Sequence, residues 1–420
     1  MLADVDEADQ WIDVVAEVVE LWEPRSEKIA QVGLLGDESG RLKFVKWTSA
    51  DLPELEEGEA YRFESVVTDE YQGRFSVSCN SATAISPSDD VVAASDGSVA
   101  VVGSIVDVQE GSGLIKRCGA DDCTRVLRNG RCAEHGQRDG EFDLRIKAIL
   151  DDGERSLSAL FDATATEAVT GISLSDATDM AMDALSTDVV AEEISAQLLG
   201  RRYRLTGSVV GTYFLVDHSE RCSDQSDLSD DAIEPALTAR QPARRVFAQE
   251  LNASIQTFQE SDAERAPLFG LSPTGTAFNR VLVIGTLTET RDVGSDSEYW
   301  QGRVYAGSEP VFVYAGQYQP DVMEALRQAE TPSYVAVVGK HRSYESGDRT
   351  NVAIEPEFVI PVDEETRDAW VEETAAQTSA RIDAFEAGRG PFGERARRVY
   401  GEDMSGLVEA VEAINGTADE

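Results

Sequence analysis

The sequence predicts a mainly β protein made of small barrels in tandem, one of them with an inserted metal-binding knuckle, followed by a helical C-terminal region. Three observations predict this class. Apolar and polar residues alternate with the period of a strand through most of the chain. A similar order of strands and turns recurs at about domain length. The 420 residues also exceed what one core usually serves, so we expect two to four domains.

The first barrel is predicted at residues 1–90. Five runs of alternating apolar residues are its expected strands: WIDVVAEVVELWEP, IAQVGLLGDESG, RLKFVKW, AYRFESVVTDEY and RFSVSCN. The segment DLPELEEG between the third and fourth strands is expected to form a short helical link. GLLGDESGRLKFVKW is similar to KAILDDGERSLSALF further along the chain, which indicates a second copy of the same unit.

The second barrel is predicted at residues 96–217, with an insert at 118–135. Its expected strands are SVAVVGSIVDVQEGSG, EFDLRIKAILDD, ERSLSALF, RRYRLTGSVV and TYFLVD. Residues 163–199 have helical spacing. Four of their apolar residues fall on one predicted buried stripe: Leu185, Val189, Ile194 and Leu198. A five-stranded barrel with a helix between its third and fourth strands is the OB-fold.

The insert concentrates three of the chain's five cysteines and one of its three histidines. The spacing is Cys118-x4-Cys123-x8-Cys132-x2-His135, with an Asn-Gly turn between the two ligand pairs. Two such pairs can wrap one tetrahedral ion, and zinc suits both thiolate and imidazole ligands. Four protein ligands leave no open position, so we expect one structural zinc ion. The alternatives are a chance cluster or a disulfide pair.

The remaining chain predicts a tether, a third barrel and a helical tail. Residues 218–240 are polar and acidic and are interpreted as a linker. The third OB-fold is expected at 241–361, with QPDVMEALRQAE as its helix, and the tail at 362–420. Apolar residues of the tail either need a partner surface or pack on their own barrel: Trp370, Ile382, Phe385, Val399, Leu407 and Val411.

The charge is strongly one-sided. The chain has 79 acidic and 37 basic residues, a net charge of −42, and lysine is rare. A dense acidic surface with few lysines resembles the proteins of salt-loving archaea. One alternative is an acidic protein that repels nucleic acid. The other is a disordered acidic chain, and the sustained apolar alternation argues against it.

Several features predict a cytoplasmic protein. No run of about 18 apolar residues appears, so we expect no contact with a membrane. The N-terminus MLADVDEADQWIDVV is acidic and lacks the basic-then-apolar pattern of an export signal. Scarce, clustered cysteine also suits a reducing compartment.

Two segments carry a family resemblance. Residues 1–217 resemble the DNA-binding part of haloarchaeal replication protein A, because tandem OB-like units carry a zinc knuckle after the first strand of one of them. Residues 241–386 resemble the separate replication-protein-A-associated protein, through RVFAQELNASI, GTLTETRDVGSDSEYW, VYAGQYQP and VAVVGKHRSYE. The chain departs from this family in two ways. The family commonly carries these parts on separate polypeptides, and four cysteines are frequent where this knuckle has Cys3His.

The resemblance implies a single-stranded DNA-binding protein of replication, repair and recombination, partnered by other replication protein A subunits or replication proteins. Binding a strand without sequence preference needs cations and exposed aromatic rings along a groove. We therefore select aromatic and basic residues of the three barrels as expected DNA contacts: Lys43, Lys46, Trp47, Tyr71, Arg74, Phe75, Arg125, Arg128, Trp300, Arg303 and Tyr344.

Some of these residues have a structural alternative. Trp47 can cap the barrel core, and Phe75 can pack inside it beside Phe44, which is expected in the core. The arginines of the knuckle either touch phosphates or solvate a small exposed module. Strand alternation also requires about half of the third-barrel set to face inward.

Enzyme signatures are missing from the sequence. We find no phosphate-binding G-x4-GK-[ST] loop, no G-x-S-x-G elbow and no H-E-x-x-H motif. We therefore do not expect an enzyme. The second hypothesis is a scaffold subunit, whose C-terminal region recruits replication partners and makes little DNA contact of its own.

Overall fold

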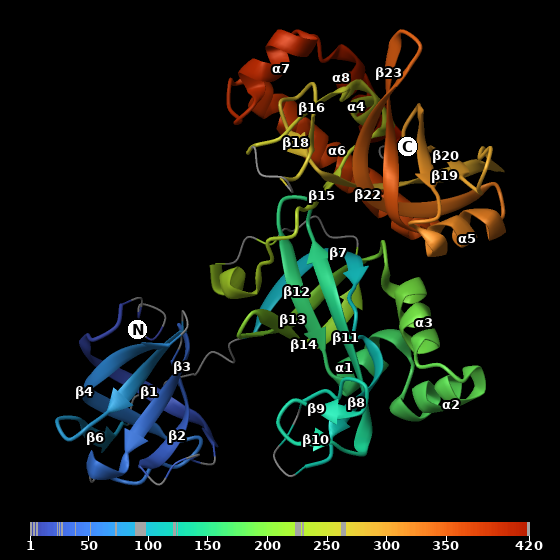
Figure 1. The fold of residues 1–420 in the computed structure, drawn as a ribbon. Helices are drawn as coiled ribbons and strands as arrows, with labels where there is room; N and C mark the ends of the chain where they lie inside the picture. Colours follow the sequence, from blue (N-terminus) through green and yellow to red (C-terminus); the bar gives the residue numbers. More distant parts are fainter. Residues whose placement is uncertain are drawn as a thin grey trace. The chain divides into compact units, whose positions relative to one another are not determined.

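The computed structural model describes most of the chain. The described residues are 2, 5, 7–22, 24, 26, 28–37, 39–50, 52–71, 74–88, 98–120, 123, 125–222, 228, 231–261 and 266–417. For residues 71, 74, 231, 232 and 413–417, only the backbone is described. The chain forms two compact units, Met1–Val99 and Ala100–Glu420 (Figure 1). No described helix is long and apolar enough to cross a membrane.

Unit 1 is one closed barrel. Its elements are β1 Trp11–Trp22, β2 Ile29–Asp37, β3 Gly40–Trp47, the 3-10 turn η2 Thr48–Ala50, β4 Ala60–Tyr71, β5 Arg74–Cys79 and β6 Ala84–Pro87. The order β1-β2-β3-β5-β4 closes through a β1–β4 pairing, and β3 runs parallel to β5. This is the five-stranded topology of an OB-fold. Alternate inward residues of the strands form the core: Ala16, Val18, Leu35, Phe44, Phe63, Val66 and Val77.

Unit 2 begins with a second barrel of the same topology. Its strands are β7 Val99–Val108, β8 Gly113–Cys118, β9 Arg131–Cys132, β10 Gly136–Gln137, β11 Gly140–Asp151, β12 Ser156–Phe161, β13 Arg202–Val210 and β14 Tyr213–Arg221. Its helices are α1 Ala163–Thr170, α2 Leu174–Ala184, α3 Asp188–Leu198 and the 3-10 turn η3 Asp231–Ala236. The ring β7-β11-β12-β14-β13 is closed, and β12 runs parallel to β14. The knuckle joins β8 to β11, so it lies in the loop between the first two barrel strands.

A third barrel completes the pattern. The short elements before it are β15 Ala243–Arg245, α4 Ala248–Ala253, β16 Gln256–Phe258, β17 Phe269–Leu271 and β18 Ala277–Phe278. The barrel consists of β19 Arg280–Asp292, β20 Trp300–Tyr305, β21 Pro310–Ala315, α5 Pro320–Gln328, β22 Ser333–Ser346 and β23 Arg349–Pro361. It closes through β19–β22, with β21 parallel to β23. The predicted class, mainly β with tandem OB-folds and C-terminal helices, is confirmed.

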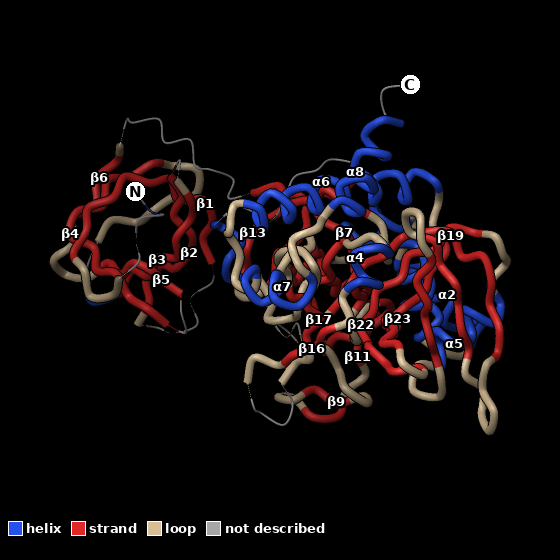
Figure 2. The backbone as a smooth tube through the Cα atoms, turned by 90° about the horizontal axis from the view of Figure 1, so that it is seen from above, coloured by secondary structure: helices blue, strands red, loops and turns tan. Residues whose placement is uncertain are grey.

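The helical tail packs within unit 2. It consists of α6 Glu364–Glu386, α7 Gly393–Tyr400 and α8 Ser405–Thr417, and Figure 2 shows α6 beside α8. The indole of Trp370 is buried and donates to the carbonyl of Leu282, 3.0 Å away, in the third barrel. Other tail residues form a core with the small sheet β16-β17-β18: Ile382, Phe385, Ala396, Met404 and Leu407. Of the predicted residues, Trp370 and Val411 pack on the third barrel, as that alternative expects, Ile382, Phe385 and Leu407 pack on the small sheet instead, and Val399 is exposed.

Three local expectations are wrong. Residues 52–58 form no helix; Leu55 is buried, and its backbone exchanges hydrogen bonds with the Gln31 amide. Residues 163–199 are helical as predicted but form three helices; Ile194 and Leu198 are fully buried as expected and Val189 is half-buried, whereas Leu185, the left-handed cap of α2, is 93% exposed. The predicted tether is packed in part, because Leu228, Ile233 and Ala236 are fully buried, although most of its other described residues are exposed or half-buried.

A buried ionic junction joins the second barrel to the C-terminal part of unit 2. Arg245 on β15 and Asp151 at the end of β11 are both fully buried and form an ion pair. Arg245 also lies 3.1 Å from the carboxylate of Glu373 on α6, and Arg202 of the second barrel lies 2.7 Å from it. Although burial lowers the pKa of Arg245, Glu373 and Asp151 raise it overall. Arg245 therefore stays charged in a site closed to water.

Candidate metal centre and nucleic-acid interface

The local fold of the knuckle brings its four ligands together. Cys118 ends β8, Cys132 lies on β9, and His135 precedes β10. Arg128 and Arg131 exchange backbone hydrogen bonds of 3.0 Å around a two-residue turn. The turn residues Asn129 and Gly130 both have positive φ, 51° and 72°. Such a turn favours Asn-Gly because both positions need the left-handed region.

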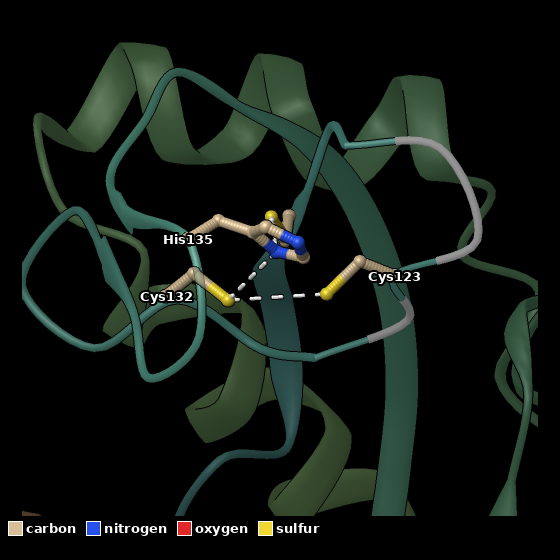
Figure 3. Close-up of side chains that lie close together, drawn as sticks. Cys123, Cys132 and His135 are labelled. Atoms are coloured by element: carbon tan, nitrogen blue, oxygen red, sulfur yellow. Dashed lines mark hydrogen bonds between the residues drawn. The ribbon is translucent and has the colours of Figure 1, made fainter.

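The distances fit one tetrahedral ion. The four ligand atoms all lie within 4.8 Å of one another. Cys123 Sγ is 3.8 Å from Cys132 Sγ, and His135 Nδ1 is 3.6 Å from Cys118 Sγ and 3.7 Å from Cys132 Sγ (Figure 3). Zinc–sulfur bonds of about 2.3 Å at tetrahedral angles put two sulfurs about 3.8 Å apart. The residues thus form a Cys3His cluster compatible with one zinc ion.

The chemistry of the donor set also suits a cation. The three thiols are buried, and His135 is exposed. Backbone N–H groups of His135 and Glu134 lower the pKa of Cys132 to about 6, whereas burial raises the pKa of Cys118. All the cysteines are free, and a sulfur separation of 3.8 Å is far from a disulfide bond. The disulfide alternative therefore does not hold in this structure.

Unit 1 has three exposed tryptophans, Trp11, Trp22 and Trp47, and the last two share one outer face of the barrel. On β3, Leu42, Phe44 and Lys46 alternate with Lys43, Val45 and Trp47, and the second set faces out. Strand pairing aligns Trp22 of β1 with Val32 of β2, and Val32 with Val45. Trp22 therefore shares the face of Trp47, and their exposed fractions are 38% and 37%. Trp22 was not among the expected contacts, because only the register between β1, β2 and β3 places it on this face.

Lys43 and Trp47 occupy this outer face as expected. Lys43 is exposed and pairs across the sheet with Leu34 and Ser76. The indole of Trp47 donates to Ser78 Oγ at 2.6 Å, which holds the ring along β5 instead of over the barrel core. Phe75 is half-buried, and the side chains of Tyr71 and Arg74 lie outside the described part of the chain.

Lys46 is not available to a phosphate. Its side chain is 3% exposed, and its ammonium group donates to the carbonyl of Pro53 at 2.6 Å. Burial lowers the pKa of Lys46, while Glu54 and Cys79 oppose that shift. The expected DNA contact at Lys46 is therefore corrected: it shares the inward face with Phe44.

The second barrel has a basic groove beside the knuckle. The groove has a volume of about 960 Å³, and its basic lining residues are Lys116, Arg128, Arg145 and Lys147. Arg145 and Lys147 alternate on the outer face of β11. The ammonium of Lys147 lies 5.7 Å from the ring centre of Tyr213, and that of Lys116 lies 4.6 Å from the exposed ring of Phe142. Sequence reasoning missed Lys116, Arg145 and Lys147 as lining residues of one groove, and it missed Phe142 as the ring beside Lys116.

The two arginines selected in the knuckle have different surroundings. Arg128 is exposed and lines the groove. Arg125 is exposed too, but it forms an ion pair with Glu134 and lies 3.9 Å from Cys123 Sγ. Arg125 therefore balances charge around the cysteine cluster, and Arg128 faces the groove.

The third barrel carries an aromatic cluster on the corresponding face. Tyr299 stacks on Tyr314 with ring centres 5.7 Å apart, and Tyr344 packs edge-on against Tyr314 at 6.2 Å. Arg303 points the same way and donates to the Tyr305 hydroxyl at 2.8 Å. Burial and the neighbouring Tyr314 raise the pKa of Tyr344 to about 12, so its hydroxyl stays neutral.

Trp300 belongs to the core of the third barrel. It is half-buried and packs against the large cluster that also contains Leu287, Val304 and Leu326. Trp300, Gly302 and Val304 share the inward face of β20, and Gln301, Arg303 and Tyr305 share the outward face. The expected contact at Trp300 is corrected for this reason, whereas Arg303 and Tyr344 lie on the aromatic face.

The similar solved structures given below each cover between a fifth and a third of this chain. No protein-family profile matches the chain, and no curated protein matches it. One similar solved structure is an OB domain of a Methanosarcina mazei protein, 46% identical over 21% of this chain and 83% of that chain, with a TM-score of 0.21. Another is the second single-stranded DNA-binding protein of Mycobacterium smegmatis, 21% identical over 20% and 86%, with a TM-score of 0.18. A replication protein A heterotrimer bound to single-stranded DNA is 14% identical over 33% and 96%, with a TM-score of 0.22.

Proposed function

We propose that this chain is a single-stranded DNA-binding protein of the replication protein A type, acting in the cytoplasm in replication, repair and recombination. One observation carries the proposal. Each of the three barrels carries aromatic side chains and cations on outward-facing strand positions, and OB-folds bind oligonucleotides on the outer surface of their strands. Trp47 and Lys43 share the outer face of β3, Lys147 lies beside the ring of Tyr213, and Arg303 lies beside the ring of Tyr305.

In this proposal, aromatic rings and cations contribute to DNA binding in different ways. Aromatic rings stack on bases whatever their identity, because every base has a flat π face. Cations such as Lys43 and Lys147 neutralise phosphates without reading sequence. A zinc ion held by the Cys3His cluster folds the loop between the first two strands of the second barrel, and this places Arg128 at the groove. Because four protein ligands fill the coordination shell, the zinc has a structural role.

A binding titration tests the proposal. The full chain is titrated into fluorescently labelled oligo-dT and into the matching duplex, in potassium chloride from 0.2 M to molar concentrations. We expect tight binding to the single strand and weak binding to the duplex. Equal affinity for both, or no binding to either, would reject single-stranded DNA binding.

A second function has one observation in its favour. In the third barrel, the ring of Tyr314 already packs against Tyr299 and Tyr344, so the protein itself covers part of this aromatic face. A scaffold role for the C-terminal region would use such a face for protein contacts. The discriminating variant is Tyr305→Ala with Arg303→Ala in the full chain. Unchanged DNA affinity favours the scaffold role, and a loss of affinity favours DNA contact by all three barrels.

A further inference from the structure

A basic cleft lies where the second barrel meets the C-terminal part of unit 2. It measures about 900 Å³, and its cationic lining residues are Arg240, Arg280, Lys340 and Arg342. Arg240 lies between η3 and β15, Arg280 starts β19, and the other two are on β22. A chain with a net charge of −42 has few places where cations gather in this way.

Two of the four cations form ion pairs with carboxylates, and the other two form none with a described residue. Arg240 lies 3.1 Å from Asp107 and 2.7 Å from Glu357, and Arg280 lies 2.6 Å from Glu357. Lys340 and Arg342 are exposed on alternate positions of β22, and neither forms an ion pair with a described residue. Glu355 also lines the cleft. Among the described residues, the four cations outnumber the three carboxylates of Asp107, Glu355 and Glu357.

The cleft continues the groove of the second barrel. β11 runs from the knuckle, where Gly140 pairs with Cys118, to the buried junction at Asp151 (Figure 1). Arg145 and Lys147 face the groove along this strand, and the next outward residue, Ile149, is covered by the C-terminal part of the unit. Asp107 lines the groove, and its ion-pair partner Arg240 lines the cleft. The groove and the cleft thus meet at one salt bridge.

The lining of the cleft fits phosphates better than bases. None of the described residues that line it is a phenylalanine, tyrosine or tryptophan. The imidazole of His341, between Lys340 and Arg342, is buried, and its Nε2 is 2.8 Å from the carbonyl oxygen of Ser254. The exposed groups are an ammonium and a guanidinium, which bind phosphate oxygens through charge-assisted hydrogen bonds.

We propose that a single strand lying in the groove of the second barrel continues into this cleft, where Lys340 and Arg342 contact its phosphates. The inference rests on the proposed function and adds a path outside the barrel grooves. It predicts contacts that do not depend on base identity and that only strands long enough to leave the groove can make.

The test uses the full chain with Lys340→Gln and Arg342→Gln together. The matched control, Arg389→Gln with Arg398→Gln, removes two exposed cations from the helical tail. Each protein is titrated with oligo-dT of about 8 and about 30 nucleotides, since one OB-fold occupies roughly 4–16. We expect the cleft variant to bind the long strand at least about fivefold more weakly than the parent. The slope of log affinity against log salt should also become shallower by about 1.4, because each lost phosphate contact on a single strand removes about 0.7 from it. The short strand and the control should bind like the parent.

Photocrosslinking gives a readout that does not depend on the variants. Long strands carrying 5-iododeoxyuridine should crosslink to peptides that contain residues 239–241 or 340–343. If the cleft variant binds long strands like the parent and no such peptide is found, the path is wrong while DNA binding stands. If the parent binds no strand of either length, the proposed function itself fails. A cleft variant that loses only polyglutamate binding would assign the cleft to acidic peptides and overturn the proposal.

Discussion

At the scale of single residues, the exposed tryptophans of unit 1 should dominate its DNA affinity. Stacking contributes about 1–3 kcal/mol per base, so Trp22→Ala or Trp47→Ala should weaken binding by roughly 5- to 150-fold. Lys43→Ala should weaken DNA binding less than either tryptophan variant, because molar salt weakens phosphate contacts. Fluorescence anisotropy with oligo-dT in molar potassium chloride measures all three variants.

The matched control is Trp47→Phe. This variant keeps an aromatic face, smaller than that of indole, and loses the N–H that donates to Ser78. It should retain most of the affinity that Trp47→Ala loses. Alanine variants that bind like the parent while keeping its circular dichroism spectrum would show that stacking on this face is not the source of affinity.

The cysteine cluster makes a second residue-scale prediction. Protein purified without chelators should contain one zinc per chain by elemental analysis, and Cys123→Ser should contain less than half of that. Because structural zinc contributes folding free energy directly, the variant should become protease-sensitive within residues 114–140, while unit 1 stays folded. Cys79→Ser, away from the cluster, is the control. Absence of zinc from the parent protein would contradict the assignment.

Some site residues were predictable from the sequence and others were not. The four knuckle ligands share one hairpin, so their spacing alone predicts that they meet. Lys46 is two residues from Phe44, and assigning Phe44 to the core already required Lys46 to point inward. Trp22 could not be found this way, because only the register between β1, β2 and β3 places it on the face of Trp47.

At the scale of elements, the N-terminus of α6 should be sensitive to acid. Asp363 caps this helix, accepts a hydrogen bond from the backbone of Thr366 at 2.9 Å, and lies 2.9 Å from Arg221 at the end of β14. Although burial raises its pKa, the bonds from Thr366 and Arg221 hold the pKa of Asp363 down to about 2. A lowered pKa in the folded state means that the stabilising charge is present above the unfolded value of 3.8 and is lost as pH falls toward 2.

The variant Asp363→Asn tests this dependence of stability on pH. At pH 6 the variant should have a smaller free energy of unfolding than the parent. This difference in free energy should disappear as pH falls from about 4 to about 2, and urea unfolding in molar salt measures it. Glu364→Gln changes a neighbouring acid that does not cap the helix. A gap that stays constant across this window for Asp363→Asn would disprove the role of the cap.

The ionic junction allows a larger effect to be predicted. Arg245→Met leaves Asp151 and Glu373 buried without their shared cation, which should cost about 3–5 kcal/mol in the free energy of unfolding of unit 2. Arg244→Met is the control. Arg244 forms an ion pair with the mostly exposed Glu154, and such pairs contribute about 0–1 kcal/mol. Similar unfolding curves for the two variants would show that the junction adds little.

The elements were predictable where the pattern was long. Strands such as β11 and β19 have 12 and 13 residues and contain long apolar stretches, so their signal is strong. The sheet β16-β17-β18 was missed because its strands have three residues or fewer, too short for a period to register. The junction was also invisible, since Arg245 and Glu373 are distant in sequence and their pairing depends on the folded positions of β15 and α6.

At the scale of the whole molecule, the acidic surface should make DNA binding tolerant of salt. In molar salt the Debye length falls to about 3 Å, so the acidic surface scarcely repels a strand, and distant cations scarcely attract it. Counterion release also loses force as bulk salt rises. We therefore expect binding to persist in molar potassium chloride with a shallow salt slope. A steep fall in affinity across this range would show that phosphate contacts dominate.

The junction also bears on how much the second barrel and the C-terminal part depend on each other. A fragment that ends at residue 217 would expose Asp151 and remove Arg245 and Glu373, its buried partners in the junction. We propose residues 1–90 as a separable domain, and residues 98–420 as the smallest stable fragment that contains the second barrel. Limited proteolysis of the full chain should release these two pieces, and a stable fragment covering only 98–217 would contradict this division.

Because Arg245, Asp151, Glu373 and Arg202 hold the second and third barrels in one arrangement, unit 2 should behave as a molecular ruler. Two binding surfaces at a set separation are bridged only by a strand of sufficient contour length. A shorter strand occupies one surface, and a longer one engages the second as an intramolecular step, at high effective concentration. Affinity plotted against strand length should then rise in a step, as expected for a gauge, and not by an equal increment for each nucleotide.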